Sequence, residues 1–316
     1  MTEQTIPVVS LSDFETDRAG FCRRAGEALA ELGFVAVEDH GISQAVFDAV
    51  YRDFAAFFAL PEATKQRYER PEVGRARGYT SFGVEHAKDR DVPDLKEFFH
   101  VGREVVPEHP RLGRLVPNAW PTEIAGLREH TLALFARLDR VAAVMLEALS
   151  RHLGAPPDLL PSMAEDGNTV LRVIHYPVCE GFDRPGAMRA AEHEDINLMT
   201  LLPPSPQSGL EILTRHGEWT PVRAIPGQIV VDTGDMTSRV TNGRIPATTH
   251  RVVNPAGDPE PRYSMPFFVH PHVDTVLEVL PQCLAPGETP APPIGSEEFL
   301  LERLRAIGVA RAPDPD

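Results

Sequence analysis

The stretch AAEHEDINLMTLLP, residues 190–203, places a histidine and an aspartate two positions apart, His193 and Asp195, ahead of a run of apolar, strand-forming residues. Successive side chains of a β-strand point to opposite faces, so residues two apart share a face. The spacing predicts that His193 and Asp195 bind one metal ion together, while Glu194 points away. The pair alone is weak support for a metal site, because histidine and aspartate are both common at surfaces.

A third ligand is expected at His250, which lies in a second strand-like run, TTHRVV, at 248–253. In a jelly roll, a strand this far downstream can return beside the first one. Two histidines and one carboxylate on one face of an octahedral Fe(II) leave three positions open for other ligands. The three residues together are therefore a candidate iron site.

Arg262 follows His250 by twelve residues, in the run PRYSMPFF at 261–268. Arg262 and Ser264 are two apart and are expected to share one face of a strand. A guanidinium among apolar residues needs an anionic partner, and its fork matches a carboxylate with two parallel hydrogen bonds. The pair is predicted to hold the carboxylate of a ligand. The alternative is an internal salt bridge to one of the many acidic residues.

From residue 168 onward, the sequence consists of short strand-like runs separated by turn residues. The runs are TVLRVIHYP, NLMTLL, LEILTRHGEWTPV, GQIVVDTGD, TTHRVVN and RYSMPFFVHP. Their spacing predicts antiparallel strands in two sheets, arranged as a double-stranded β-helix, or jelly roll. The expected fold class is mainly β, with α-helices flanking the jelly-roll core.

Helical periodicity is concentrated in the first half of the chain. Ser12 and Glu15 form a capping-box pair ahead of a helix that Gly33 ends. A strand over 34–40 and helices over 43–59, over 122–153 and from Ser296 onward are also expected, with a proline-rich connector at 105–121. The chain is predicted to be a single domain, 1–316, with a mixed helical and strand region at 1–160, the jelly-roll core and metal site at 168–280, and a helix and tail at 285–316.

Two other motifs could be mistaken for ligand sites. TNGRIP, residues 241–246, lacks the glycine pattern of a phosphate-binding turn and is predicted to form a hairpin or bend. His270 and His272 are two apart, but Pro271 interrupts their strand, and no nearby carboxylate is partnered with them. Both histidines are predicted to be structural or solvated.

Composition limits the partners of this chain. The 316 residues include 31 Lys and Arg against 46 Asp and Glu, a formal charge of −15, which repels phosphate backbones and anionic membranes. No nucleic-acid or membrane partner is therefore expected. The three cysteines have no paired spacing, and the first residues have neither a basic start nor an apolar segment. These features predict a cytoplasmic protein with reduced thiols.

Several segments together resemble a known family. HEDINLMTLL, GLEIL, PGQIVVDTGDM, TNGRIPATTHRVVNP and RYSMPFF, in this order and spacing, are similar to the isopenicillin N synthase-like branch of the Fe(II)/2-oxoglutarate-dependent dioxygenases. Upstream, IPVVSLSDF, GFVAVEDHGIS, GYTSFGVE and DLKEFFHVGRE resemble the N-terminal half of that branch. The resemblance covers nearly the whole chain except the connector near residue 110 and the tail.

The resemblance implies a role for each motif. His193, Asp195 and His250 would be the catalytic iron ligands, and Arg262 and Ser264 would bind the distal carboxylate of 2-oxoglutarate. The family's activity would be the oxidation of a small molecule, by default its hydroxylation, with dioxygen as the oxidant and with release of succinate and carbon dioxide.

Tyr176 would assist in binding 2-oxoglutarate. It lies in LRVIHYP, where the family often has Asn-Tyr-Tyr-Pro. This chain has Ile174 in the Asn position and His175 in that of the first Tyr, so a hydrogen bond from the Asn position is in doubt, while the Tyr176 hydroxyl is retained. A buried tyrosine of the core is an equally good interpretation of Tyr176.

Three residues are candidates for contact with the substrate. Arg172 and Arg239 are expected to contact an anionic substrate, and Phe268 to line its site, although surface ion pairing and core packing would explain these residue types equally well.

Three alternative functions remain open at this point. One is an isopenicillin N synthase-type oxidase that needs no 2-oxoglutarate, since such relatives keep the Arg-x-Ser pair for a substrate carboxylate. Another is a non-catalytic jelly-roll module that binds a metal. The third is a metal-dependent hydrolase, which would have no use for a carboxylate clamp.

Overall fold

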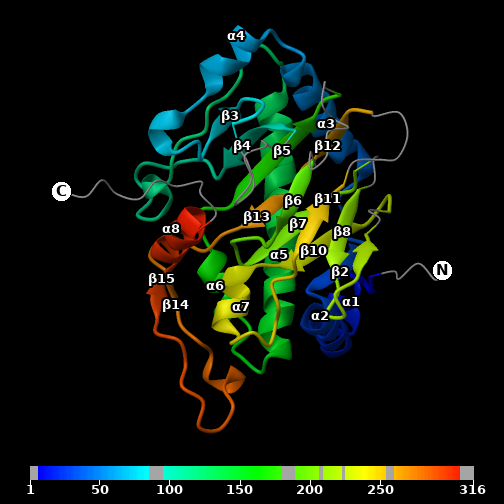
Figure 1. The fold of residues 1–316 in the computed structure, drawn as a ribbon, viewed down its shortest axis with the longest axis vertical. Helices are drawn as coiled ribbons and strands as arrows, with labels where there is room; N and C mark the ends of the chain where they lie inside the picture. Colours follow the sequence, from blue (N-terminus) through cyan, green and yellow to red (C-terminus); the bar gives the residue numbers. More distant parts are fainter. Residues whose placement is uncertain are drawn as a thin grey trace.

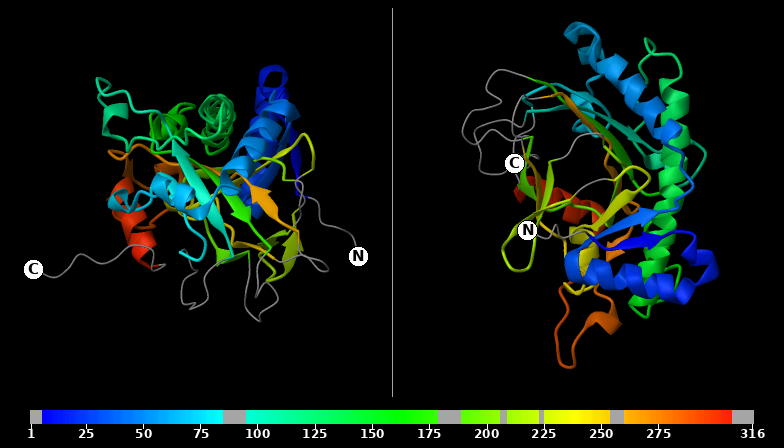
Figure 2. Two further views of the ribbon diagram at one scale, coloured as in Figure 1. Left: turned by 90° about the horizontal axis from the view of Figure 1, so that it is seen from above. Right: turned by 90° about the vertical axis from the view of Figure 1, so that its right-hand side faces the viewer.

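A computed structural model describes residues 6–84, 95–178, 189–205, 209–222, 225–253 and 260–306. Its centre consists of two facing β-sheets, with the longest helices along the outer side of the larger sheet (Figure 1 and Figure 2). The larger sheet has the strand order β1-β2-β10-β7-β13-β5-β4-β3, with β12 also paired to β5, and the smaller one has the order β6-β11-β8-β9. The prediction of a jelly-roll core with flanking helices is confirmed.

The strands are short. The larger sheet contains β1 (Val8–Ser10), β2 (Phe34–Glu38), β3 (Gly78–Thr80), β4 (Glu97–Gly102), β5 (Val170–Tyr176), β7 (Met199–Leu202), β10 (Ile229–Thr233), β12 (Arg262–Ser264) and β13 (Phe267–Val269). The smaller sheet contains β6 (Ala190–His193), β8 (Leu210–Leu213), β9 (Trp219–Pro221) and β11 (His250–Val252). A separate pair is formed by β14 (Val276–Leu277) and β15 (Ile294–Gly295).

The helices are α1 (Asp13–Thr16), α2 (Arg18–Leu32), α3 (Gln44–Phe58), α4 (Glu62–Lys65), α5 (Leu127–His152), α6 (Leu159–Ala164), α7 (Asp235–Val240) and α8 (Ser296–Ala306). Short 3-10 turns lie at Gln66–Tyr68, Pro71–Val73, Leu112–Arg114 and Pro281–Cys283. Helix α5 runs along the larger sheet and packs against α2 and α3 (Figure 1). None of the helices in the described part of the chain combines the length and apolar character needed to cross a membrane.

Alternation along the strands of the larger sheet separates two apolar layers. Val35 and Val37 of β2 belong to the main core, which lies between this sheet and the helices. Phe34 and Ala36, which point the other way, pack with Ile212 of the smaller sheet. The inner face of the jelly roll is therefore the one that carries Phe34 and Ala36 on β2. Neighbouring strands of the larger sheet continue this face, which carries Arg172 and Tyr176 on β5.

The predicted helix start at Ser12 is wrong. Ser12 precedes only the four-residue α1 and makes no capping hydrogen bond to it, and α2 begins at Arg18. The cap of α2 is Asp17, whose carboxylate accepts from the Gly20 amide at 3.0 Å. Gly33 ends α2 as predicted, with a φ of 69° that a side chain would disfavour.

Two other differences concern the N-terminal half. Strands β3 and β4 were not predicted, because β4 is buried on both faces and shows no alternation of apolar and polar residues, and β3 has too few residues to show a period. The long helix begins at Leu127 rather than at residue 122, since Gly126 precedes it in the left-handed conformation at a φ of 83°. The predicted bend at TNGRIP is confirmed, with Asn242 and Gly243 both at positive φ.

Candidate functional site

The three predicted metal ligands come together at the end of the smaller sheet. His193 is the last residue of β6 and is the register partner of His250, the first residue of β11. One ligand atom from each of His193, Asp195 and His250 lies within 4.8 Å of the other two. The Oδ1 atom of Asp195 is 3.9 Å from Nε2 of both histidines. The three donors therefore surround one point.

Strand alternation accounts for only part of this arrangement. Asp195 lies beyond the end of β6, so it does not share a strand face with His193. The loop turns Asp195 toward the histidines, and its carbonyl accepts from the Asp235 amide at 2.8 Å. Glu194 bonds instead to the Thr249 hydroxyl, which agrees with the prediction that it points away from the ligands.

The protonation of both histidines suits metal binding. Nδ1 of His193 lies 2.7 Å from the Ala191 carbonyl, and Nδ1 of His250 lies 3.1 Å from the Thr248 carbonyl. A carbonyl only accepts, so each Nδ1 carries a proton, and Nε2, which faces Asp195, is the ring atom that can bind a metal ion. Two neutral imidazoles and one carboxylate form the donor set that Fe(II) accepts with positions left open.

A buried threonine orients the carboxylate ligand. The Thr200 hydroxyl donates to Oδ2 of Asp195 and accepts from the Asn197 amide at 2.8 Å. Because Oδ2 is held in this way, Oδ1 is the atom that faces the two histidines. Hydrogen bonds of this kind fix the direction of a metal ligand. Thr200 was not identified from the sequence, where it is one of several polar residues within strands.

Asp232 of β10 is a second carboxyl group near the triad. It is 7% exposed, and burial together with the neighbouring Asp195 raises the pKa of Asp232 well above its usual range. Thr200 is its partner across β7 and β10. Asp232 was not identified from the sequence, although an aspartate inside the apolar run IVVDT was a signal for it.

Arg262 and Ser264 lie on β12 and are buried, as expected for two residues on one face. The Arg262 side chain is 2% exposed, and neither Nε nor NH1 has a hydrogen-bond partner among the described residues. No salt bridge links Arg262 to a carboxylate of the described part of the chain. A buried guanidinium without an anion is costly, and the internal salt bridge considered from the sequence is not present among the described residues.

Tyr176 lies directly opposite Arg262 in the pairing of β5 with β12. The Arg262 guanidinium is 5.2 Å from the centre of the Tyr176 ring, and that of Arg189 is 5.9 Å from the same ring. Arg189 precedes β6, the strand that ends at His193, and is also buried. Burial lowers the pKa of Arg189, and the charge of Arg262 lowers it further. Two buried guanidinium groups therefore converge on Tyr176.

Of the residues predicted to contact a substrate, the structure brings two together. The Arg172 guanidinium lies 4.3 Å from the centre of the Phe98 ring and 5.4 Å from that of Phe268. Its Nε donates to Nε2 of His100 at 2.6 Å. Arg239 lies elsewhere, on α7, where it bonds to the Pro292 carbonyl and covers the Phe299 ring of α8.

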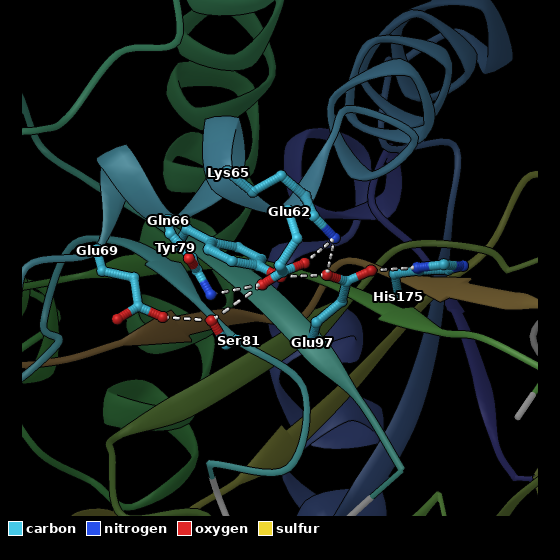
Figure 3. A network of polar contacts seen from close by, with 8 residues as sticks. All are labelled: Glu62, Lys65, Gln66, Glu69, Tyr79, Ser81, Glu97 and His175. Carbon is cyan, nitrogen blue, oxygen red and sulfur yellow. Dashed lines mark hydrogen bonds and ion pairs between the residues drawn. The ribbon is translucent and has the colours of Figure 1, made fainter. Parts of the chain in front are cut away.

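A second cluster of ionisable groups lies on the other face of β4 and β5 (Figure 3). The Glu97 carboxylate accepts from Lys65 Nζ at 2.6 Å, from His175 Nδ1 at 2.8 Å and from the Tyr79 hydroxyl. Burial alone would raise the pKa of Glu97, but these hydrogen bonds together hold it below its usual value. The ring of His175 stacks on Tyr263 at 4.7 Å. This cluster contains partners for all of its charges.

Comparison with known proteins identifies the family. Residues 6–123 match the model of the N-terminal region of non-haem dioxygenases of morphine synthesis, and residues 167–271 match that of the 2OG-Fe(II) oxygenase superfamily. The chain is 32% identical to the 2-oxoglutarate-Fe(II) type oxidoreductase ppzD of Metarhizium rileyi, over 86% of this chain and 81% of the relative. It is 30% identical to the oxidoreductase hxnY of Emericella nidulans, over 93% and 88% of the two chains.

Solved structures agree with these relatives. A protein of the 2OG-Fe(II) oxygenase family from Caulobacter crescentus is 39% identical, with a TM-score of 0.86 over 96% of this chain and 99% of that one. A full-length Neurospora crassa protein, solved in complex with alpha-KG and thymine, is 28% identical, with a TM-score of 0.84 over 95% and 96% of the two chains.

The fold, the donor triad and these matches show that the chain belongs to the 2OG-Fe(II) oxygenase superfamily. It is an oxidoreductase that depends on Fe(II) and 2-oxoglutarate and uses dioxygen. The family resemblance noted from the sequence is confirmed.

Proposed function

We propose that His193, Asp195 and His250 hold the iron, that Arg262, Ser264 and Tyr176 bind the distal carboxylate of 2-oxoglutarate, and that the enzyme hydroxylates a small-molecule substrate. Fe(II), when bound with 2-oxoglutarate and dioxygen, supplies the oxidising chemistry and releases succinate and carbon dioxide. The chain itself holds one face of the metal and positions the cosubstrate and a substrate C–H bond.

The observation that carries this proposal is the state of Arg262. Its guanidinium is buried and lacks an anion among the described residues, and Ser264 lies on the same strand face. A dicarboxylate anchored by one end to the metal would bring its other carboxylate to this group, with two parallel hydrogen bonds to the guanidinium fork. Tyr176, whose ring lies near both guanidinium groups, offers its hydroxyl to the same carboxylate.

The substrate is proposed to lie beside Arg172 and Phe268. Both are on strands of the larger sheet, with the Arg172 guanidinium 5.4 Å from the centre of the Phe268 ring. The Neurospora crassa protein, a structural neighbour, has been solved with the small molecules thymine and 5-formyluracil. Arg239 is left out of this proposed site, because its contacts are with Pro292 and α8. We further propose that residues 1–316 form one dioxygenase domain that acts in the cytoplasm on small molecules, without a nucleic-acid or membrane partner.

Anaerobic titration of the Fe(II) protein with 2-oxoglutarate tests the proposal. A bidentate chelate of the metal gives a weak visible charge-transfer band, which should appear in the parent protein and disappear in the His250→Ala variant. With oxygen and substrate admitted, succinate should form in an amount that matches the substrate oxidised. An isopenicillin N synthase-type oxidase would consume oxygen without forming either the band or succinate.

A further inference from the structure

Arg77 is a buried cation on the inner face of the jelly roll, outside the groups that hold iron and cosubstrate. Its side chain is fully buried, and it lies flat on Gly102, where an added Cβ would come within 2.2 Å of the guanidinium. Gly102 and His100 are two apart on β4 and so share a face. The Arg77 guanidinium therefore lies on the same face of β4 as His100, which is the register partner of Arg172 on β5.

The contacts of Arg77 leave its charge unbalanced. NH1 donates to the Ala76 carbonyl at 2.7 Å and NH2 donates to Oδ1 of Asn168 at 2.6 Å, and both acceptors are neutral. Nε has no partner, and no carboxylate of the described residues forms a salt bridge with Arg77. Burial alone lowers the pKa of Arg77 to about 10, so the group remains a cation at neutral pH. A buried cation of this kind is costly unless an anion binds to it.

His270 connects Arg77 to the iron site. Burial lowers the pKa of His270 to about 4, and Asp195, Arg77 and Arg172 all lie close enough to influence it. The imidazole is therefore neutral at pH 7, and its Nδ1 has no hydrogen-bond partner in the described part of the chain. A ligand beside His270 would therefore lie among the charges of Arg77, Arg172 and Asp195.

Arg172 is held in position from two sides. Its Nε donates to Nε2 of His100, whose Nδ1 in turn donates to the Arg75 carbonyl at 3.0 Å, so His100 is the neutral tautomer and carries no charge. Phe98 and Phe268 lie against the guanidinium. These contacts fix the plane of a cation that faces the same region as Arg77 and His270.

We propose that Arg77 and Arg172 bind the carboxylate of an organic acid that is the substrate of this enzyme, with the body of the acid against Phe98 and Phe268. This inference rests on the proposed function and specifies its substrate class. Neutral His270 offers Nδ1 to the same ligand. The interior thus carries cations for two anions, 2-oxoglutarate at Arg262 and the substrate at Arg77, in a chain whose net charge is −15.

Paired ligands that differ only in charge test the inference. The Fe(II) protein is first saturated with 2-oxoglutarate under anaerobic conditions, so that the Arg262 site is filled. Benzoate, phenylacetate and hexanoate are then titrated against benzamide, phenylacetamide and hexanamide, with the charge-transfer band and the melting temperature as readouts. At least one carboxylate should bind about tenfold more tightly than its amide, as expected when a charge-assisted hydrogen bond is lost.

Variants of the two arginines locate the site. Arg77→Gln and Arg172→Gln should each remove most of the preference for the carboxylate, and Arg77→Lys should keep part of it because it keeps the charge without the fork. Arg103→Gln is the matched control, since Arg103 directly follows β4 but is already paired with Asp139 at 2.6 Å. It should lower the melting temperature and leave the preference unchanged.

Two outcomes would overturn the inference. One is that no carboxylate is preferred over its amide although the chelate band forms, which leaves the proposed function intact. The other is that the full preference for the carboxylate is kept in both Arg77→Gln and Arg172→Gln. If Arg77→Gln does not fold, the full preference kept in Arg172→Gln, which retains only the Arg77 cation, overturns the inference equally. Absence of the chelate band itself would count against the proposed function. The melting temperature of an Arg262→Gln variant, with and without each carboxylate, would then decide whether Arg77 binds an anion.

Discussion

The triad and the Glu97 cluster both combine histidine with carboxylate, yet they differ in how far their polar atoms are satisfied. In the Glu97 cluster, one carboxylate accepts from Lys65, His175 and Tyr79 at hydrogen-bond distance (Figure 3). In the triad, Asp195 stands 3.9 Å from both histidines, too far for hydrogen bonds.

This difference separates a structural cluster from a binding site. Where every donor meets an acceptor, the groups stabilise one packing and have no capacity left for a ligand. Where two Nε2 atoms and one carboxylate oxygen face a common point, the groups can hold a metal ion. The same reasoning applies to the arginines: Arg103 is paired with Asp139, while Arg262 and Arg77 have no carboxylate among the described residues.

The largest effect is expected from the triad. His193→Ala, Asp195→Ala and His250→Ala should each abolish turnover and weaken Fe(II) binding severely, because two remaining protein ligands no longer compete well with water. Fe(II) affinity and succinate release are the measurements. Glu194→Gln is the matched control and should leave both nearly unchanged, since Glu194 bonds to Thr249. Normal iron binding by Asp195→Ala would show that Asp195 is only a neighbour.

The next largest effect is expected at Arg262. Arg262→Gln would leave a buried carboxylate of 2-oxoglutarate without its cation, a loss of about 3 to 5 kcal/mol. At about 1.4 kcal/mol for each factor of ten, the Kd for 2-oxoglutarate should rise by roughly a hundredfold or more. Fe(II) affinity should change little.

Two further variants sharpen this experiment. Arg262→Lys should recover only part of the affinity, and Arg251→Gln, which removes an arginine already paired with Glu211 at 2.8 Å, should leave it unaltered. An iron-loaded Arg262→Gln protein with the parent affinity for 2-oxoglutarate would contradict the assignment.

In the Glu97 cluster, the expected effect is on stability rather than on activity. Lys65→Met leaves the buried Glu97 carboxylate without its cation and should lower the free energy of unfolding by about 3 kcal/mol. Denaturant unfolding measures this change, and the double variant Lys65→Met with Glu97→Leu should recover part of it. If the folded Lys65→Met protein lost 2-oxoglutarate binding while its stability was unchanged, this cluster would belong to the active site.

The Glu97 cluster also predicts a dependence on pH. Because the pKa of Glu97 is lower in the folded protein than its ordinary value of 4.5, the carboxylate contributes stability at pH values above 4.5. That contribution should be lost as the pH falls below 4.5 and through the lowered pKa. Unfolding followed from pH 7 to pH 3 should show a shallower acid limb for Glu97→Gln than for the parent protein.

The smallest effect is expected from Thr200. Thr200→Val keeps the volume but removes the hydroxyl that holds Oδ2 of Asp195. Fe(II) affinity should fall by about tenfold, as is usual when a hydrogen bond that orients a metal ligand is lost. Thr131→Val, which removes a buried hydroxyl bonded to the Leu127 carbonyl of α5, is the matched control. Equal iron affinities in the two variants would exclude an orienting role for Thr200.

The amino-acid sequence by itself determined the fold class, the triad and the Arg-x-Ser pair. Alternation within strands, turn residues and ligand spacings are local patterns, and the folded structure agrees with such local preferences. The sequence could not show that Asp195 lies past the end of β6, because strand ends depend on which neighbour pairs with each residue. For the same reason the sequence did not show that Asp17, rather than Ser12, caps helix α2.

Only the tertiary structure decided which residues of one type have which role. Arg172 and Arg239 were equal candidates in the sequence, but pairing of β4 with β5 places Arg172 beside Phe98 on the inner face, while α7 carries Arg239 against α8. Arg77 is more than a hundred residues from the metal ligands and had no signal of its own. Its burial on Gly102 follows from long-range strand pairing, which no local pattern in the chain encodes.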